Sequence, residues 1–173
     1  TTVLFLSYLK PNKGVPVLIQ AFKNLDLDDT ELIIAGTGSE RDRVEKLVEN
    51  DDNIKYLGYV EEPEKNQLYS KSDVFVLPTE WDSWGLVVNE AMHYELPIIT
   101  TEDAASKEIV NNNGFVIESD DVSALENALE TLLSDPELRT KMGEQSKEII
   151  EQYDTEFLAS TFRCAIDDVL DTS

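Results

Sequence analysis

The sequence has a single cysteine, Cys164, among its 173 residues. A disulfide within the chain is therefore impossible, and a zinc site built from several cysteines is excluded. Long apolar runs are also missing, since none approaches the ~20 residues that a membrane-spanning helix needs. We therefore expect a cytoplasmic domain that does not insert directly into a membrane.

Basic residues are scarce as well, because 14 Lys and Arg stand against 36 Asp and Glu, a formal net charge of −22. Nucleic acids and anionic membranes attract basic surfaces, so this charge argues against both as partners. The few basic residues are unevenly placed, and residues 1–25 contain three lysines and no acid. A local cationic site near the amino end is therefore compatible with an acidic, solubilising remainder.

The composition is that of a folded domain, with 41% hydrophobic and 29% charged residues. A length of 173 residues predicts one domain over residues 1–173. The chain enters an apolar run at Val3 with no basic region or cleavage pattern before it. We therefore expect it to be one part of a longer protein.

Short apolar runs alternate with helical patterns along the first two thirds of the chain. Each run is too brief for a helix and predicts a buried strand. The six runs are residues 3–6, 32–35, 54–57, 74–77, 98–101 and 115–117. This alternation predicts a Rossmann-like α/β fold, an open doubly wound parallel sheet of about six strands with helices on both faces. Three further helices are expected after the last strand, at 122–133, from the Ser134–Glu137 start signal, and at 158–169.

Ligands of such sheets bind at the carboxyl ends of the strands. The first loop there, residues 9–14, holds Lys10 and Lys13 just before a predicted helix, which favours an anion site, although a solvated turn would look the same. The second loop begins with Gly36 and is rich in small residues, which let a ligand approach the backbone, and a plain tight turn is the alternative.

The loop after the fourth predicted strand, residues 78–85, contains more candidate ligand-binding residues than the other loops. It contains Trp81, Asp82, Trp84 and Gly85 and leads into a helix with Glu90. Backbone amides at Gly85 and beyond can cradle a phosphate, and carboxylates can accept hydrogen bonds from sugar hydroxyls. The loop therefore indicates a site for a phosphorylated sugar derivative.

The run from Asp82 to Met92 reads Asp-Ser-Trp-Gly-Leu-Val-Val-Asn-Glu-Ala-Met and is followed by Leu-Pro-Ile-Ile at residues 96–99. It resembles the Glu-x7-Glu signature of the group 1 glycosyltransferases with the GT-B fold. Further segments similar to that family are residues 5–14, 36–40, 57–60, 68–69, 72–78 and 113–116. The resemblance covers the whole chain and implies the carboxyl-terminal, donor-binding domain, with the acceptor site in an absent amino-terminal domain. Any peripheral contact with a membrane would come from that domain.

The resemblance also implies an activity. The full protein is expected to be a retaining glycosyltransferase that moves a hexose from a nucleotide diphosphate sugar to a glycan or lipid acceptor, in the synthesis of cell-surface polysaccharide or glycoconjugate. This chain alone is expected to be inactive. No cofactor or metal is expected, because a lysine and a helix dipole would stabilise the departing diphosphate.

The implied catalytic residues are Lys13 for the diphosphate, Asp82 for hydroxyls of the transferred sugar and Glu90 for the ribose. Backbone at Tyr59 and Val60 would meet the base. The remaining expected donor contacts are Tyr8, Gly36, Ser83, Trp84, Gly85, Leu86 and Val87.

The sequence departs from the family at two of these positions, where Tyr8 replaces the usual arginine and Asp82 replaces the first glutamate. These departures keep open a catalytically inactive nucleotide- or sugar-binding module on the same fold. A glycosidase using Asp82 and Glu90 is a third alternative, and it would need two facing carboxylates. His93, the one histidine, is expected to have a packing role.

Overall fold

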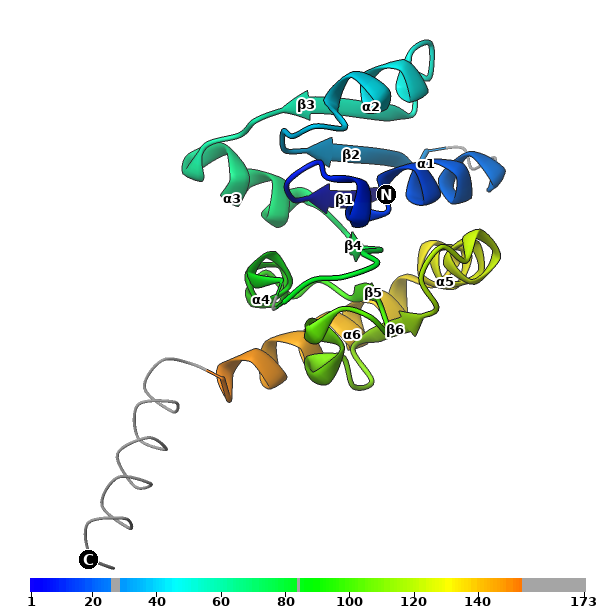
Figure 1. Cartoon of the computed structure of the whole chain (residues 1–173). Coiled ribbons are helices and arrows are strands. Elements are labelled where there is room, and N and C mark those ends of the chain that lie inside the picture. The colour runs from blue at the N-terminus through cyan, green and yellow to red at the C-terminus, as the bar shows by residue number, and fades with distance from the viewer. Residues whose placement is uncertain (26–28, 84, 154–173) are drawn as a thin grey trace, which may run out of the picture.

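The computed structural model describes residues 1–25, 29–83 and 85–153 (Figure 1). Its centre is a parallel sheet with the strand order β3-β2-β1-β4-β5-β6, which runs from top to bottom in Figure 1. The strands are β1 (Thr2–Leu6), β2 (Glu31–Ala35), β3 (Ile54–Gly58), β4 (Val74–Leu77), β5 (Ile98–Thr101) and β6 (Gly114–Ile117). All six predicted strands are confirmed, with ends that differ by one residue at most.

The helices between the strands are α1 (Val15–Asn24), α2 (Arg41–Val48), α3 (Glu62–Lys71) and α4 (Leu86–His93), with short 3-10 turns η1 (Pro11–Lys13) and η2 (Ala105–Ile109). Apolar periodicity did not predict α3, because Tyr69 is the one buried residue of this polar helix. Two of the expected carboxyl-terminal helices are present, α5 (Val122–Ser134) and α6 (Pro136–Glu151). The expected helix at 158–169 lies outside the described residues.

The central strands are covered on both faces. Every residue of β4 and β5 is buried, as are four of the five residues of β1, because near-continuous apolar strands pack against helices on each side. Helix α1 packs against α2 and α5, and α4 packs against α6. The doubly wound arrangement is therefore confirmed. The expectation of buried strands is wrong for the edges, since Leu57 in β3 and Val116 in β6 are exposed.

The order in which successive strands are added to the sheet reverses between β1 and β4. The chain runs outward from β1 to β2 and β3, then returns to place β4 on the other side of β1. An open α/β sheet has its ligand crevice at such a point, outside the carboxyl ends of the two strands. Here the two loops meet closely, because a Cβ added to Gly14 would lie 1.9 Å from the Pro78 carbonyl oxygen.

This contact predicts a large effect of Gly14→Ala. Gly14 has φ 64°, and alanine there would combine left-handed strain of about 1 kcal/mol with a clash against rigid backbone, so we expect a loss of about 3 kcal/mol in urea unfolding. Gly58→Ala is the matched control, because Gly58 has φ 72° but nothing within 4 Å of an added Cβ. Equal losses in the two variants would contradict the close loop contact.

Candidate functional site

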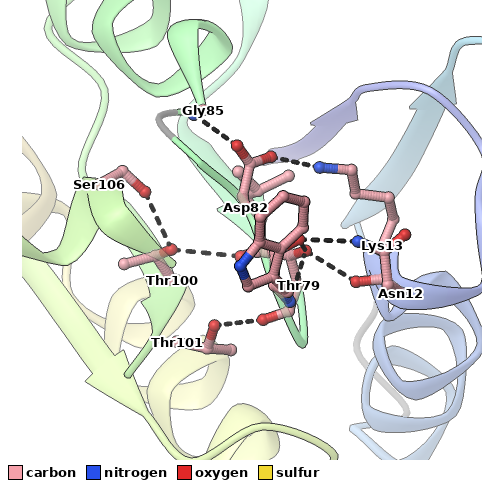
Figure 2. A network of polar contacts seen from close by, with 10 residues as sticks. Asn12, Lys13, Thr79, Asp82, Gly85, Thr100, Thr101 and Ser106 are labelled. Carbon is pink, nitrogen blue, oxygen red and sulfur yellow. Dashed lines mark hydrogen bonds and ion pairs between the residues drawn. The ribbon is translucent and has the colours of Figure 1, made fainter. Parts of the chain in front are cut away.

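The loops after β1 and β4 are joined by a cluster of hydrogen bonds around Asn12 (Figure 2). The Asn12 carbonyl oxygen accepts from the Glu80 backbone N–H at 2.9 Å and lies 2.7 Å from the Thr79 hydroxyl oxygen. The Asn12 side-chain amide donates to the Trp81 carbonyl oxygen at 2.7 Å. The main-chain carbonyl and the side-chain amide of Asn12 thus both hold the loop after β4 against the loop after β1.

Buried hydroxyls support this junction from the neighbouring strand β5 (Figure 2). Thr101 donates to the Thr79 carbonyl oxygen, and Thr100 donates to the Leu77 carbonyl oxygen at 3.3 Å. All of these threonine side chains are fully buried, so each polar group needs the partner it has. Sequence reasoning missed these residues, although hydroxyls at the end of an otherwise apolar strand were the available signal.

Lys13 and Asp82 form an ion pair across the junction, and Figure 2 shows the lysine ammonium pointing at the carboxylate. The two side chains are 11% and 13% exposed. The second oxygen of Asp82, Oδ1, accepts from the Gly85 backbone N–H at 2.7 Å, immediately before α4. The structure therefore brings three predicted residues together, and the Asp82 carboxylate lies between the cation and the start of the helix.

A hollow of about 670 Å³ opens above this ion pair. Seven of the predicted donor contacts line it, from the loop after β1 and from the loop that leads into α4. They are Tyr8, Lys13, Asp82, Ser83, Gly85, Leu86 and Val87. Lys10 lines it as well, whereas Trp84 lies outside the described residues.

A second hollow of about 290 Å³ shares Ser7, Tyr8 and Val87 with the first, so the two lie side by side at the carboxyl edge of the sheet, and together they are called the cleft. The other predicted contacts lie here, namely Gly36, Tyr59 and Val60. Glu62 and Lys65 of α3 complete its wall, and sequence reasoning missed both because α3 itself was not expected.

Glu90 differs from the other predicted residues because it lines neither hollow. Its carboxylate accepts from the Lys65 ammonium at 2.9 Å on Oε1 and from the Tyr69 hydroxyl at 2.8 Å on Oε2. Lys65 itself reaches the second hollow. Glu90 is thus joined to the cleft through a lysine.

Burial and neighbouring charge set the protonation of these partners. Burial is the main cause that raises the pKa of Tyr69 far above its usual value, with the Glu90 carboxylate adding to the shift, so the hydroxyl stays a donor. For Lys65, burial acts to lower the pKa, but hydrogen bonds to Glu90 and Glu62 outweigh it and the pKa is raised. Lys65 is therefore a stable cation.

His93 is exposed at the end of α4, so its expected packing role is wrong. Within the described ranges, no group of three or more His, Cys, Asp or Glu side chains is arranged to hold a metal ion. No helix in the same ranges is long and apolar enough to cross a bilayer.

Comparison with known proteins decides the family. The sequence profile described as "Glycosyl transferases group 1" matches residues 1–149. The chain belongs to this family. It is 32% identical over 168 residues to the phosphatidyl-myo-inositol mannosyltransferase of Mycobacterium leprae, covering 92% of this chain and 44% of that protein. The chain spans less than half the length of the curated relatives that it matches.

Two solved structures have the same fold as this group 1 family member. The C-terminal domain of a glycosyl transferase group 1 family protein from Francisella tularensis superimposes with a TM-score of 0.78 at 23% identity, covering 89% of this chain and 86% of that one. The pneumococcal O-GlcNAc transferase, in complex with UDP and GlcNAc, gives 0.84 at 22% identity, covering 98% of this chain and 36% of that one.

The site geometry predicts unequal costs for removing two acids. Asp82→Ala leaves Lys13 and the Gly85 amide without this partner in a poorly hydrated place, so we expect a loss of about 3 kcal/mol in urea unfolding. Glu31→Ala removes an ion pair with Lys55 whose side chains are 34% and 56% exposed, together with a hydrogen bond from the Thr2 hydroxyl, and should cost about 1 kcal/mol. Equal losses would show that the Lys13–Asp82 pair is as weak as a surface pair.

Proposed function

We propose that this chain is the donor-binding half of a retaining glycosyltransferase that uses a nucleotide diphosphate sugar. The single observation that carries the proposal is the pair of adjacent hollows at the strand-order reversal, with Lys13 and the start of α4 in one and Tyr59 and Val60 in the other. A cation beside a helix amino terminus suits a diphosphate, and a separate hollow beyond it suits a nucleoside. The UDP and GlcNAc held by the pneumococcal relative support this choice of ligand.

Lys13 is proposed to contact the donor diphosphate. Its ammonium has three protons, of which Asp82 takes one, so donors remain for a phosphate oxygen. The amides of Leu86 and Val87 open α4 in the same hollow and add to the attraction, because the first amides of a helix have no partner within it. The Gly85 amide already donates to Asp82 and is not counted among these donors.

The proposed chemistry needs positioning and charge stabilisation rather than a covalent enzyme intermediate. As the bond to the sugar breaks, negative charge grows on the leaving diphosphate, and Lys13 with the α4 amides stabilises it. Asp82 and Ser83, which line the same hollow, are proposed to contact hydroxyls of the transferred hexose. Glu90 is proposed to accept from the ribose, and no metal is assigned a role.

The acceptor site is proposed to lie in the part of the protein beyond this chain, because the relatives are more than twice as long. The acceptor would be a glycan or lipid, and the setting a cytoplasmic enzyme of polysaccharide or glycoconjugate synthesis. Any contact with a membrane surface is assigned to that other part.

The structure argues against one of the two alternatives, and a binding measurement distinguishes the other. A glycosidase needs Asp82 and Glu90 to flank one bond, yet Asp82 is paired with Lys13 of the loop after β1 and Glu90 with Lys65 of α3. An inactive binding module would keep the cleft, so only ligand measurements with this chain distinguish it. Absence of binding to UDP, GDP and ADP at millimolar concentration would favour a module that has lost the donor.

Calorimetric titration of UDP, GDP, ADP and their nucleosides tests the proposed roles. Lys13→Gln should weaken diphosphate binding about tenfold and leave nucleoside binding nearly unchanged, because one charge-assisted hydrogen bond to phosphate is lost. Glu90→Ala should weaken both ligand types. Lys23→Gln is the control, since Lys23 pairs with Asp51 and lines neither hollow. Equal losses for diphosphate and nucleoside in Lys13→Gln would refute the diphosphate role.

A second measurement tests whether the acceptor site lies outside this chain. The 173-residue chain, incubated with a radiolabelled nucleotide sugar and a mixture of oligosaccharide and lipid acceptors, should transfer no label, because the acceptor would have no binding surface opposite the cleft. Multiple-turnover transfer by the chain alone would contradict the proposal that the acceptor site lies outside it.

A further inference from the structure

The Asp82 carboxylate lies where the anion-binding groups of the first hollow converge (Figure 2). Its Oδ2 accepts from the Lys13 ammonium, and its Oδ1 accepts from the Gly85 backbone N–H at 2.7 Å. A cation beside the start of a helix is an arrangement that binds phosphate oxygens. Both donors are thus directed to an anion that belongs to the protein itself, and its side chain is 13% exposed.

The first hollow has little net charge for a site that takes a diphosphate. Among the described residues that line it, Lys10 and Lys13 are the cations and Asp82 is the anion, which leaves a net charge of +1. The terminal phosphate of a free nucleoside diphosphate carries about −1.5 to −2 at pH 7, because its second pKa is about 6. A sugar attached to that phosphate removes one ionisable oxygen. The nucleotide sugar and the free diphosphate therefore differ by about one negative charge there.

A carboxylate in this position interacts in opposite ways with the two ligands. It accepts hydrogen bonds and donates none, so the hydroxyls of an attached sugar can donate to it. A bare terminal phosphate presents negatively charged acceptor oxygens instead, and these are repelled. Two acceptors bound to one ammonium lie about 4 to 5 Å apart, so a phosphate oxygen held by Lys13 is close to the Asp82 charge.

We propose that Asp82 makes the donor site prefer the nucleotide sugar to the free nucleoside diphosphate that the reaction releases. This inference rests on the proposed donor site and adds product release to it. Transfer breaks the bond between the sugar and the terminal phosphate oxygen and leaves the electron pair on that oxygen. The acceptor hydroxyl forms the new bond to the sugar and releases its proton to the solution. The new negative charge then faces Asp82, which has lost the sugar hydroxyls, so the product is repelled when it has to leave.

The proposal predicts a gain of affinity from a substitution inside the site. Asp82→Asn keeps the size of the side chain and an oxygen acceptor for the Gly85 amide, but removes the negative charge beside Lys13. Free UDP, GDP or ADP should then bind about tenfold more tightly, because a like charge close to the terminal phosphate is lost. A nucleotide sugar should gain less, since its phosphate carries less charge and its hydroxyls lose an acceptor.

The test is calorimetric titration of the whole 173-residue chain with UDP and UDP-glucose, GDP and GDP-mannose, and ADP and ADP-glucose. The wild-type chain should bind a nucleotide sugar about tenfold more tightly than the matching free diphosphate. Asp82→Asn should bring the two affinities toward equality, whereas Asp82→Glu keeps the charge and should keep the preference.

The β-methyl ester of each diphosphate separates charge from sugar contacts, because it has the charge of the donor and no sugar hydroxyls. In Asp82→Asn the affinity for the free diphosphate should rise about tenfold relative to that for its ester. A general loss of folded protein would lower the number of binding sites and leave this ratio unchanged.

Asp51 provides the matched control, because it repeats the contacts of Asp82 away from the cleft. Its Oδ2 pairs with Lys23 at 3.3 Å, and its Oδ1 accepts from the Asn53 backbone N–H at 3.1 Å. It lines neither hollow of the cleft. Asp51→Asn should therefore leave every ligand ratio at its wild-type value.

Two results would overturn the inference and leave the donor site intact. One is an unchanged ratio of free diphosphate to ester in Asp82→Asn. The other needs no variant, and it is a wild-type chain that binds every free diphosphate as tightly as its nucleotide sugar or more tightly. Failure of the wild-type chain to bind any of the diphosphates or nucleotide sugars would overturn the proposed function instead.

Discussion

The loops after β1 and β4 are held against each other by backbone contact, and the cleft depends on that contact. Asn12 binds the loop after β4 through both its carbonyl oxygen and its side-chain amide, and Gly14 allows the Pro78 carbonyl to approach. Thr101 fixes the same loop from β5. Lys13 and Asp82 lie in or beside these anchored segments, so the backbone brings the two side chains within reach of each other.

Electrostatics then act locally inside a very acidic protein. The net charge of −22 would repel an anionic donor at long range, but charges beyond about 8 Å are largely screened at physiological salt. Within that range the cleft presents Lys10, Lys13 and the start of α4. The Asp82 carboxylate orients the Lys13 ammonium and the Gly85 amide. Its negative charge also lowers the positive potential of the cleft.

Strands, helices and sheet type followed from the sequence because buried parallel strands are continuous apolar runs with helical periodicity between them. The predictions failed where burial is partial. Helix α3 consists mostly of polar and charged residues and buries only Tyr69, so it has no apolar stripe that would predict it. Burial is also partial in the edge strands β3 and β6, where Leu57 and Val116 are exposed.

The sequence by itself determined the fold class, the family and most of the residues that line the cleft, because the signature from Asp82 to Met92 is contiguous and its spacing is fixed by one turn and one helix. Only the tertiary structure decided what those residues contact. Lys13 and Asp82 are 69 positions apart, and Lys65 and Glu90 are 25 apart. Such pairs are formed by strand order and helix packing, which bring distant loops and helices together, and no local pattern in the chain encodes them.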